Sequence, residues 1–160
     1  MSDRCESVLR TAVDELQRLD DRAFLSTVAL NLADLLEREG RDDEARGLCV
    51  LARERTLAED ITNFVMADAI EARLAAKGGE LERAEALARQ CVKRAGLTDF
   101  PDLRGMYSQA ALAEVLALRG KHDEAVTAAA KALAVHREKE DIAYAAVLRD
   151  GFLRLGIEVA

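Results

Sequence analysis

Few residues of this chain have a type and a spacing that could carry out chemistry. It contains two histidines, His122 and His136, fourteen residues apart. Zinc sites bring several Cys, His or carboxylate ligands together at short spacing, and neither histidine has such companions. His122 falls in a turn before a predicted helix, and His136 falls near a helix end, where the helix dipole favours a protonated imidazole. We therefore interpret both histidines as structural and expect no metal or other cofactor.

The acidic pairs and the cysteines also have structural explanations. Carboxylates are favoured at helix starts, where they cap free backbone N–H groups. Three acidic pairs fall at predicted helix starts: Asp20-Asp21, Asp42-Asp43 and Glu59-Asp60. Cys49 and Cys91 fall at inward positions of predicted helices, where cysteine acts as a small hydrophobic residue, and Cys5 lies near the N-terminus. Because no nucleophile–base pair is present, we predict that the chain is not an enzyme.

Composition and charge exclude other classes of function. Half of the 160 residues are hydrophobic, only 4% are aromatic, and there is one proline, which together favour helices. The formal net charge of −7 would repel a phosphate backbone, so nucleic acid is not expected as a partner. No apolar stretch approaches the roughly 20 residues of a membrane span. Three widely spaced cysteines and the lack of an apolar secretion segment predict a cytoplasmic protein.

Apolar spacing and turn signals predict about eight helices in one domain, 1–160. Glycines follow most of the periodic segments, as is typical of helix C-termini. The predicted elements are a leading helix at 1–19, helix pairs at 22–57, 61–95 and 101–139, and a capping helix at 141–155. The short connections favour antiparallel neighbours.

The chain also repeats itself. Residues 32–45 and 112–125 share seven of fourteen aligned positions, and a weaker copy lies at 71–84. A period near 40 residues indicates a repeat array, in which neighbouring units bury a shared core. Alanines recur at the places where the two helices of a pair must approach closely: Ala33, Ala72 and Ala113 in the first helix, and Ala45, Ala84 and Ala125 in the second.

This pattern resembles tetratricopeptide-type repeats over nearly the whole chain. The resemblance implies an all-α fold, a right-handed α-solenoid of antiparallel helix pairs. The stretches DRAFLSTVALNLADLLEREGRDDEA and TDFPDLRGMYSQAALAEVLALRGKHDEA are similar to the C-terminal repeat tails of bacterial class III adenylate/guanylate cyclases that carry an ATPase module, and of related ATPase-type transcription regulators. This resemblance implies a non-catalytic scaffold of a bacterial signalling protein. The chain carries neither the cyclase nor the ATPase motifs themselves.

In such an array the first helix of each pair lines a concave groove. Wheel geometry, with 100° per residue counted from Ala33, predicts which residues face it. The predicted partner-binding residues are Leu30, Asn31, Asp34, Met66, Arg73, Tyr107 and Glu114. Tyr107 is the best single candidate, because its ring supplies a large contact area at small entropic cost. The expected partner is another protein or a peptide, and the alternative is a peptide or small-ligand sensor whose groove closes over an effector.

The predicted first helix carries an apolar stripe that the chain can cover on one side only. The stripe consists of Val8, Ala12, Leu16 and Leu19. Terminal repeats with an apolar outer face tend to find a partner. We therefore expect self-association, a homodimer formed through the terminal helices.

Overall fold

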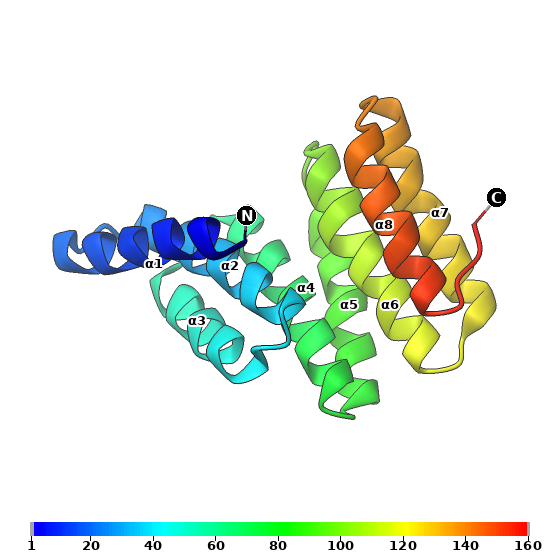
Figure 1. Cartoon of the computed structure of the whole chain (residues 1–160), viewed down its shortest axis with the longest axis horizontal. Coiled ribbons are helices and arrows are strands. Elements are labelled where there is room, and N and C mark those ends of the chain that lie inside the picture. The colour runs from blue at the N-terminus through cyan, green and yellow to red at the C-terminus, as the bar shows by residue number, and fades with distance from the viewer. Residues whose placement is uncertain (1, 160) are drawn as a thin grey trace.

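The computed structural model describes residues 2–159, and every regular element in that range is a helix (Figure 1). The elements are α1 (Ser2–Leu19), α2 (Arg22–Arg38), α3 (Asp42–Arg55), α4 (Ile61–Lys77), α5 (Leu81–Ala95), the π-helical segment η1 (Leu103–Gln109), α6 (Ala110–Leu118), α7 (His122–Glu138) and α8 (Ile142–Arg154). The predicted all-α fold of about eight helices is confirmed.

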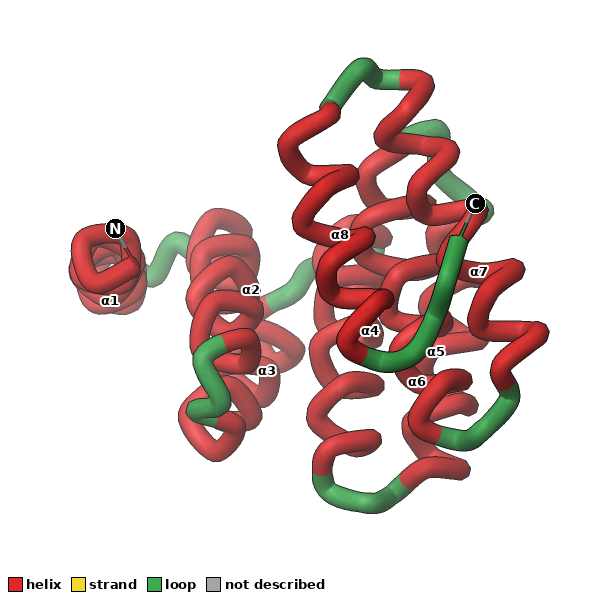
Figure 2. The backbone as a smooth tube through the Cα atoms, turned by 45° about the vertical axis from the view of Figure 1, so that its right-hand side comes forward, coloured by secondary structure: helices red, strands yellow, loops and turns green. Residues whose placement is uncertain are grey.

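The helices pack as adjacent antiparallel pairs. α2 pairs with α3, α4 with α5, and η1 with α6 pairs with α7. α1 packs on α2 at one end of the molecule, and α8 packs on α7 and α6 at the other (Figure 2). The arrangement is consistent with a tetratricopeptide-like array, in which each unit completes its core against the next.

The hairpin turns follow one scheme. Each reverses through a glycine with positive φ: Gly40 at 79°, Gly79 at 82° and Gly120 at 73°. The N–H group of the residue after each glycine then donates to a carbonyl five residues earlier, as in the bond of 2.9 Å from Arg41 to Leu36. A residue with a side chain is strained at such φ values, so glycine is favoured there. These turns explain why the predicted helix ends coincide with the glycines.

The alanines of the repeat are buried in the core. Ala45, Ala84 and Ala125 are each 0% exposed, as their predicted place between paired helices requires. The core itself has two parts. One part, mainly on α1 to α4, mixes alanines with leucines and other larger side chains. The other part, from α4 to α8, is dominated by alanine, so the helices there approach with little side-chain volume between them.

The sixth helix differs from its prediction. A continuous α-helix was expected from residue 101 to Gly120, but Leu103–Gln109 is π-helical. Within this segment Gly105 lies against α7, and a Cβ atom at Gly105 would stand 2.8 Å from the Cβ atom of Val135. A larger residue would therefore force the two helices apart. The widened turn lies near the start of the first helix of the third pair, and such turns often occur at functional sites.

Candidate functional site

The first helices of the pairs form an inner wall. α2 contacts α4, α4 contacts η1 and α6, and α6 contacts α8, whereas no direct packing joins α1, α3, α5 and α7 within residues 2–159. The array therefore curves so that α2, α4, η1–α6 and α8 lie on its inner face. This is the face on which the sequence placed the partner-binding residues.

Three of the predicted residues occupy the same repeat position in successive first helices and lie together. Asp34 of α2 forms an ion pair with Arg73 of α4, and the Nε atom of Arg73 is 4.0 Å from the Glu114 carboxylate of α6. The Arg73 side chain is only 6% exposed. The Arg73 guanidinium thus lies between two carboxylates, one from each neighbouring first helix. Asp34, Arg73 and Glu114 therefore lie close together in space.

Three further charged residues complete what we call the groove cluster. Glu37 accepts a hydrogen bond of 2.8 Å from Arg73 Nε and one of 2.6 Å from Lys77 to its backbone carbonyl. Arg38 pairs with Asp34 at 3.0 Å. The groove cluster consists of Asp34, Glu37, Arg38, Arg73, Lys77 and Glu114. The wheel also places Arg38 and Lys77 on the groove side, although neither was selected as a partner-binding residue, and only Glu37 was missed. The opposite charges of Asp34 and Arg38, four residues apart on α2, are the signal that could have selected Arg38.

The carboxylates of the groove cluster have different electrostatic environments. Burial acts to raise the pKa of Asp34, but the charges of Arg73 and Arg38 outweigh it and hold the pKa below its usual value. Glu37 behaves in the same way, because Arg73 and Lys77 outweigh its burial. Burial raises the pKa of Glu114, and Arg73 only partly offsets it. Within residues 2–159, Glu114 is the groove carboxylate without a hydrogen-bonded cation.

A hollow of about 230 Å³ opens beside this carboxylate. Its lining combines the charged groups with an aliphatic wall: Glu37, Arg73, Ala76, Lys77, Glu114, Val115, Leu118 and Leu155. Sites for drug-sized ligands usually measure about 300–1,000 Å³. The hollow is therefore the size of one or two side chains rather than of a whole small molecule.

Two tyrosines flank the cluster. Tyr107 of η1 is partly buried and packs against the part of the core that lies mainly on α1 to α4. Its hydroxyl has no hydrogen bond to any described residue, and burial, assisted by the charge of Asp34, raises its pKa. Tyr144 of α8 is also partly buried, which raises its pKa, and its ring lies 4.8 Å from that of His136. The predicted partial exposure of Tyr107 is confirmed.

Leu30 and Met66 correct the prediction. Both were expected on the groove surface, but Leu30 is 0% and Met66 5% exposed within the core. Arg73 was also expected to be partly exposed and is buried instead. The reason is that α2 and α4 are packed against helices on several sides. A helical wheel that assumes only one buried face therefore predicts too many exposed residues on these helices. Asn31 is exposed and makes no described bond to the other predicted residues.

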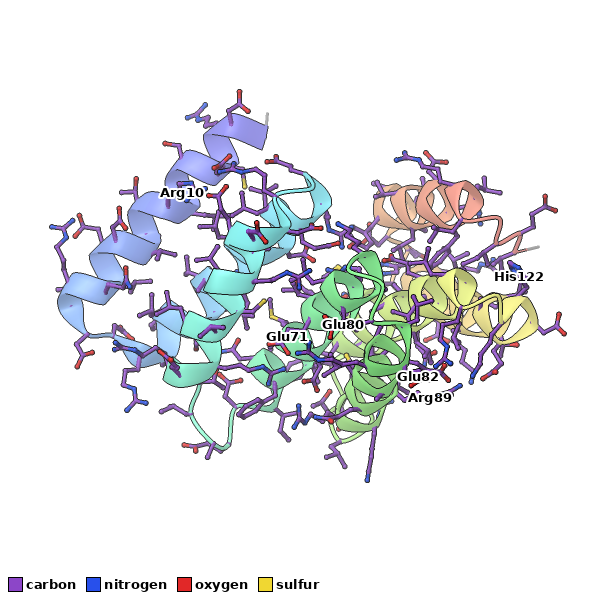
Figure 3. The ribbon with its side chains drawn as sticks, turned by 90° about the horizontal axis from the view of Figure 1, so that it is seen from below. Arg10, Glu71, Glu80, Glu82, Arg89 and His122 are labelled. Carbon is purple, nitrogen blue, oxygen red and sulfur yellow. The ribbon has the colours of Figure 1, made fainter. Side chains whose placement is uncertain are left out.

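The histidines and cysteines lie in surroundings that fit structural roles. His122 is exposed at the start of α7 (Figure 3). His136 is 1% exposed, and its Nδ1 atom is 3.4 Å from the Asp141 carboxylate without hydrogen-bond geometry. Burial raises the pKa of the Cys49 and Cys91 thiols to about 12, and Cys5 is exposed.

Among the acidic pairs, Asp21 and Asp60 cap helices as predicted. Asp20 does not, because it takes a positive φ of 51° in the turn. Arg41, not Asp42, is the N-cap residue of α3. In residues 2–159 no group of three or more His, Cys, Asp or Glu side chains could hold a metal ion, and no helix is both long and apolar enough to cross a membrane.

Comparison with known proteins assigns one segment. Residues 106–131 match the family model described as a tetratricopeptide repeat, which runs from the π-helical turn through α6 into α7. No curated protein and no solved structure matches the chain. Nothing found in these comparisons connects it with a cyclase or an ATPase. Residues 106–131 are therefore a tetratricopeptide repeat, a unit of the kind that generally binds proteins or peptides.

Proposed function

We propose that this chain is a non-catalytic protein–protein interaction module whose inner face binds a segment of another protein. The observation that carries the proposal is the Glu114 carboxylate. It is mostly buried, it has one cation at 4.0 Å and no hydrogen-bonded partner within residues 2–159, and it lines the hollow of the inner face. A buried charge that lacks a close partner is costly, so a ligand that supplies one gains affinity.

The surroundings of Glu114 define the partner's chemistry. A Lys or Arg side chain entering the hollow would bring its charge to Glu114 and lay its methylene groups along Val115, Leu118 and Leu155. Tyr107 lies seven residues before Glu114 and outside the lining of the hollow, so its partially exposed ring would contact a neighbouring residue of the bound segment. The small hollow favours a peptide side chain over the alternative of a small-ligand sensor.

Selection from a random peptide library on the immobilised protein tests this function. We expect enriched peptides to carry a basic residue and to bind about tenfold or more weakly to Glu114→Gln, because a charged hydrogen bond is lost. Glu59→Gln, which removes an exposed carboxylate outside the groove, is the matched control and should not change binding. If enriched peptides bound Glu114→Gln as tightly as the parent, or if no basic residue were enriched, the proposal would be wrong.

The proposed setting is a bacterial signalling protein, in which the array positions or senses a partner. The support is the sequence resemblance to repeat tails of cyclase–ATPase proteins; the tetratricopeptide repeat at 106–131 fits an interaction module in general. The open reading frame that encodes the chain tests this setting directly. Cyclase or ATPase modules in that frame would support it, and an unrelated neighbouring domain would contradict it.

Self-association through the terminal helices is a further proposal. Val8 and Leu19 of α1 are 62% and 74% exposed, and Ile142 of α8 is 81% exposed. Burying such side chains between two copies is favourable, by roughly 25 cal/mol per Å² of apolar area. Light scattering over a wide concentration range should show a dimer, and a monomer throughout would contradict the proposal.

A further inference from the structure

The outer face of the array has three equivalent junctions. In each, the second helix of one unit faces the start of the next second helix: α1 with α3, α3 with α5, and α5 with α7. The start of each following helix is marked by its N-cap residue: Arg41, Glu80 and Lys121. These helices do not pack directly on one another within residues 2–159, so side chains must join them.

A network of four charged residues closes the first junction. Arg10 of α1 bridges two carboxylates, with Nε at 2.8 Å from Glu6 and a terminal nitrogen at 2.6 Å from Glu44. Arg41, the N-cap residue, contacts the same two carboxylates at 2.6 and 2.7 Å. Two acids and two cations thus alternate around a square.

The third junction repeats this square. Arg89 of α5 bridges Glu85 at 2.7 Å and Glu124 at 2.6 Å, and Lys121 lies 2.8 Å from Glu85 and 3.9 Å from Glu124. Arg119, the C-cap residue of α6, also contacts Glu85, at 2.7 Å. Lys121 is an N-cap residue as Arg41 is, Glu124 follows it by three residues as Glu44 follows Arg41, and Glu85 and Arg89 are four residues apart as Glu6 and Arg10 are. In Figure 3, Arg10 and Arg89 lie at separate junctions, with Glu71 and Glu80 between them.

The middle junction has the same positions but opposite charges. Arg46 stands where Glu85 does, five residues after the N-cap; Glu80 replaces the cationic N-cap residue, and Arg83 stands where Glu124 does. Arg10 and Arg89 bridge two carboxylates in the other junctions. With every charge inverted, the equivalent position of α3, four residues after Arg46, should hold an acidic residue. It holds Val50, which is 58% exposed. The square therefore lacks one carboxylate, the one that would bridge Arg46 and Arg83.

The contacts of these residues reflect the missing acid. Arg46 donates a hydrogen bond of 3.0 Å to the Leu74 carbonyl and pairs with no carboxylate among the described residues. Arg83 is 62% exposed and pairs only with Glu80, three residues before it, at 2.9 Å. Neither arginine is joined to the facing helix by an ion pair.

A hollow of about 300 Å³ lies at this junction. Its lining includes Arg46, Val50, Arg53, Glu71 and Arg83. Glu71 is already engaged, because Arg53 holds it at 2.6 Å. The hollow thus presents two cations without an acid that bridges them, in a chain whose net charge is −7.

We propose that an acidic side chain of a partner protein docks in this hollow, with its carboxylate between Arg46 and Arg83. The carboxylate would complete the inverted square as Arg10 and Arg89 complete the other two, and the methylene groups of the acidic side chain would contact Val50. Guanidinium groups bind carboxylates through paired hydrogen bonds, which gives such contacts both strength and direction. This surface is separate from the groove cluster and binds the opposite charge, so it does not depend on the proposed function.

An NMR titration of the intact chain tests the proposal with a blocked tetraglutamate peptide as probe and a blocked tetraglutamine peptide as the uncharged control. Tetraglutamate should shift the Nε–H signals of Arg46 and Arg83, and tetraglutamine should not. Val50→Glu supplies the missing carboxylate within the chain, so it should abolish these shifts and raise the melting temperature. Val50→Gln, of similar size but uncharged, should retain them.

Arg46→Gln should weaken tetraglutamate binding about tenfold or more, since one charged partner is lost. Inorganic phosphate serves as a further probe. If phosphate shifted the same signals with equal affinity, the hollow would be a general anion site and the proposal would fail. It would also fail if tetraglutamate shifted neither arginine, or if Val50→Glu bound the peptide as tightly as the parent.

Discussion

The groove cluster and the closed squares of the outer face use the same residue types with different results. In the third junction, Lys121 and Arg89 contact Glu85 directly and lower its pKa to about 2. On the inner face, the buried Arg73 serves three carboxylates, and Glu114 receives too little of its charge, so burial raises the Glu114 pKa. On the outer face, each carboxylate of a closed square has its own cationic partners, so the charges stabilise the junction. On the inner face, three carboxylates from α2 and α6 share the single guanidinium of Arg73. Whether a buried carboxylate has a close cationic partner therefore distinguishes the contacts that join helices from the place where we propose that a ligand binds.

Both regions depend on the same alanine frame, and breaking it has the largest expected effect. Ala125→Arg inserts a long charged side chain at a position that is 0% exposed. We expect the free energy of unfolding to fall by about 5 kcal/mol, because overpacking and an unpaired buried charge act together. Urea unfolding followed by circular dichroism measures the change. Val126→Arg, at the next and partly exposed position of α7, is the control and should unfold like the parent.

Removing Arg73 tests the inner half of the comparison. Arg73→Met keeps the volume but leaves Asp34, Glu37 and Glu114 facing one another without their central cation. We expect a loss of about 3–4 kcal/mol at neutral pH, as when one partner of a buried pair is deleted. Arg10→Met in the first junction removes an equally bridging but more exposed arginine and should cost under about 1 kcal/mol. Equal losses of unfolding free energy in the two variants would contradict the proposed difference between the inner and outer faces.

The dependence of stability on pH and salt tests the ion pairs of the outer face. Glu85 has a folded-state pKa of about 2, below its unfolded value of 4.5, so its stabilising effect is present above that unfolded value and disappears as the pH falls through about 2. We expect Glu85→Gln to cost about 1 kcal/mol at neutral pH and low salt. The cost should shrink in high salt, where the charges of its partly exposed partners Arg89 and Lys121 are screened. Denaturant titrations at several pH values and salt concentrations measure it, and a cost that persisted in acid would contradict the assignment.

Glu114 should show the opposite sign and the smallest effect. Its folded-state pKa is raised above 4.5, so its contribution to stability is present below that value and is lost as the pH rises through the folded-state pKa. Glu114→Gln removes this titration, and we expect it to stabilise the fold at neutral pH by about 0.5 kcal/mol. Thermal unfolding from acid to neutral pH should show the variant gaining on the parent. A variant that was less stable at neutral pH would show that Arg73 satisfies Glu114 after all.

The sequence predicted the frame better than the surface. The alanine spacing and the turn glycines placed Ala45, Ala84 and Ala125 correctly, because tight contacts leave a pattern of small residues. The wheel failed for Leu30 and Met66, because burial from several directions leaves no periodic signal. The groove cluster was found only in part. Arginine and lysine reach across helices, and their targets depend on packing distances that the order of residues does not contain.

The π-helical turn at Leu103–Gln109 has a consequence for how the array tolerates changes in length. A π turn closes on the fifth residue rather than the fourth, so it stores extra chain without lengthening the helix in proportion. The spacing from Ala45 to Ala84 is 39 residues and that from Ala84 to Ala125 is 41, yet all three alanines remain 0% exposed. The helix that contains the π turn, 101–118, has one residue more than the 17 of α4, and α5 has one residue more than the 14 of α3. The π turn therefore accommodates one of the two extra residues. Repeat length in this chain can therefore drift while the contacts between its helices stay constant.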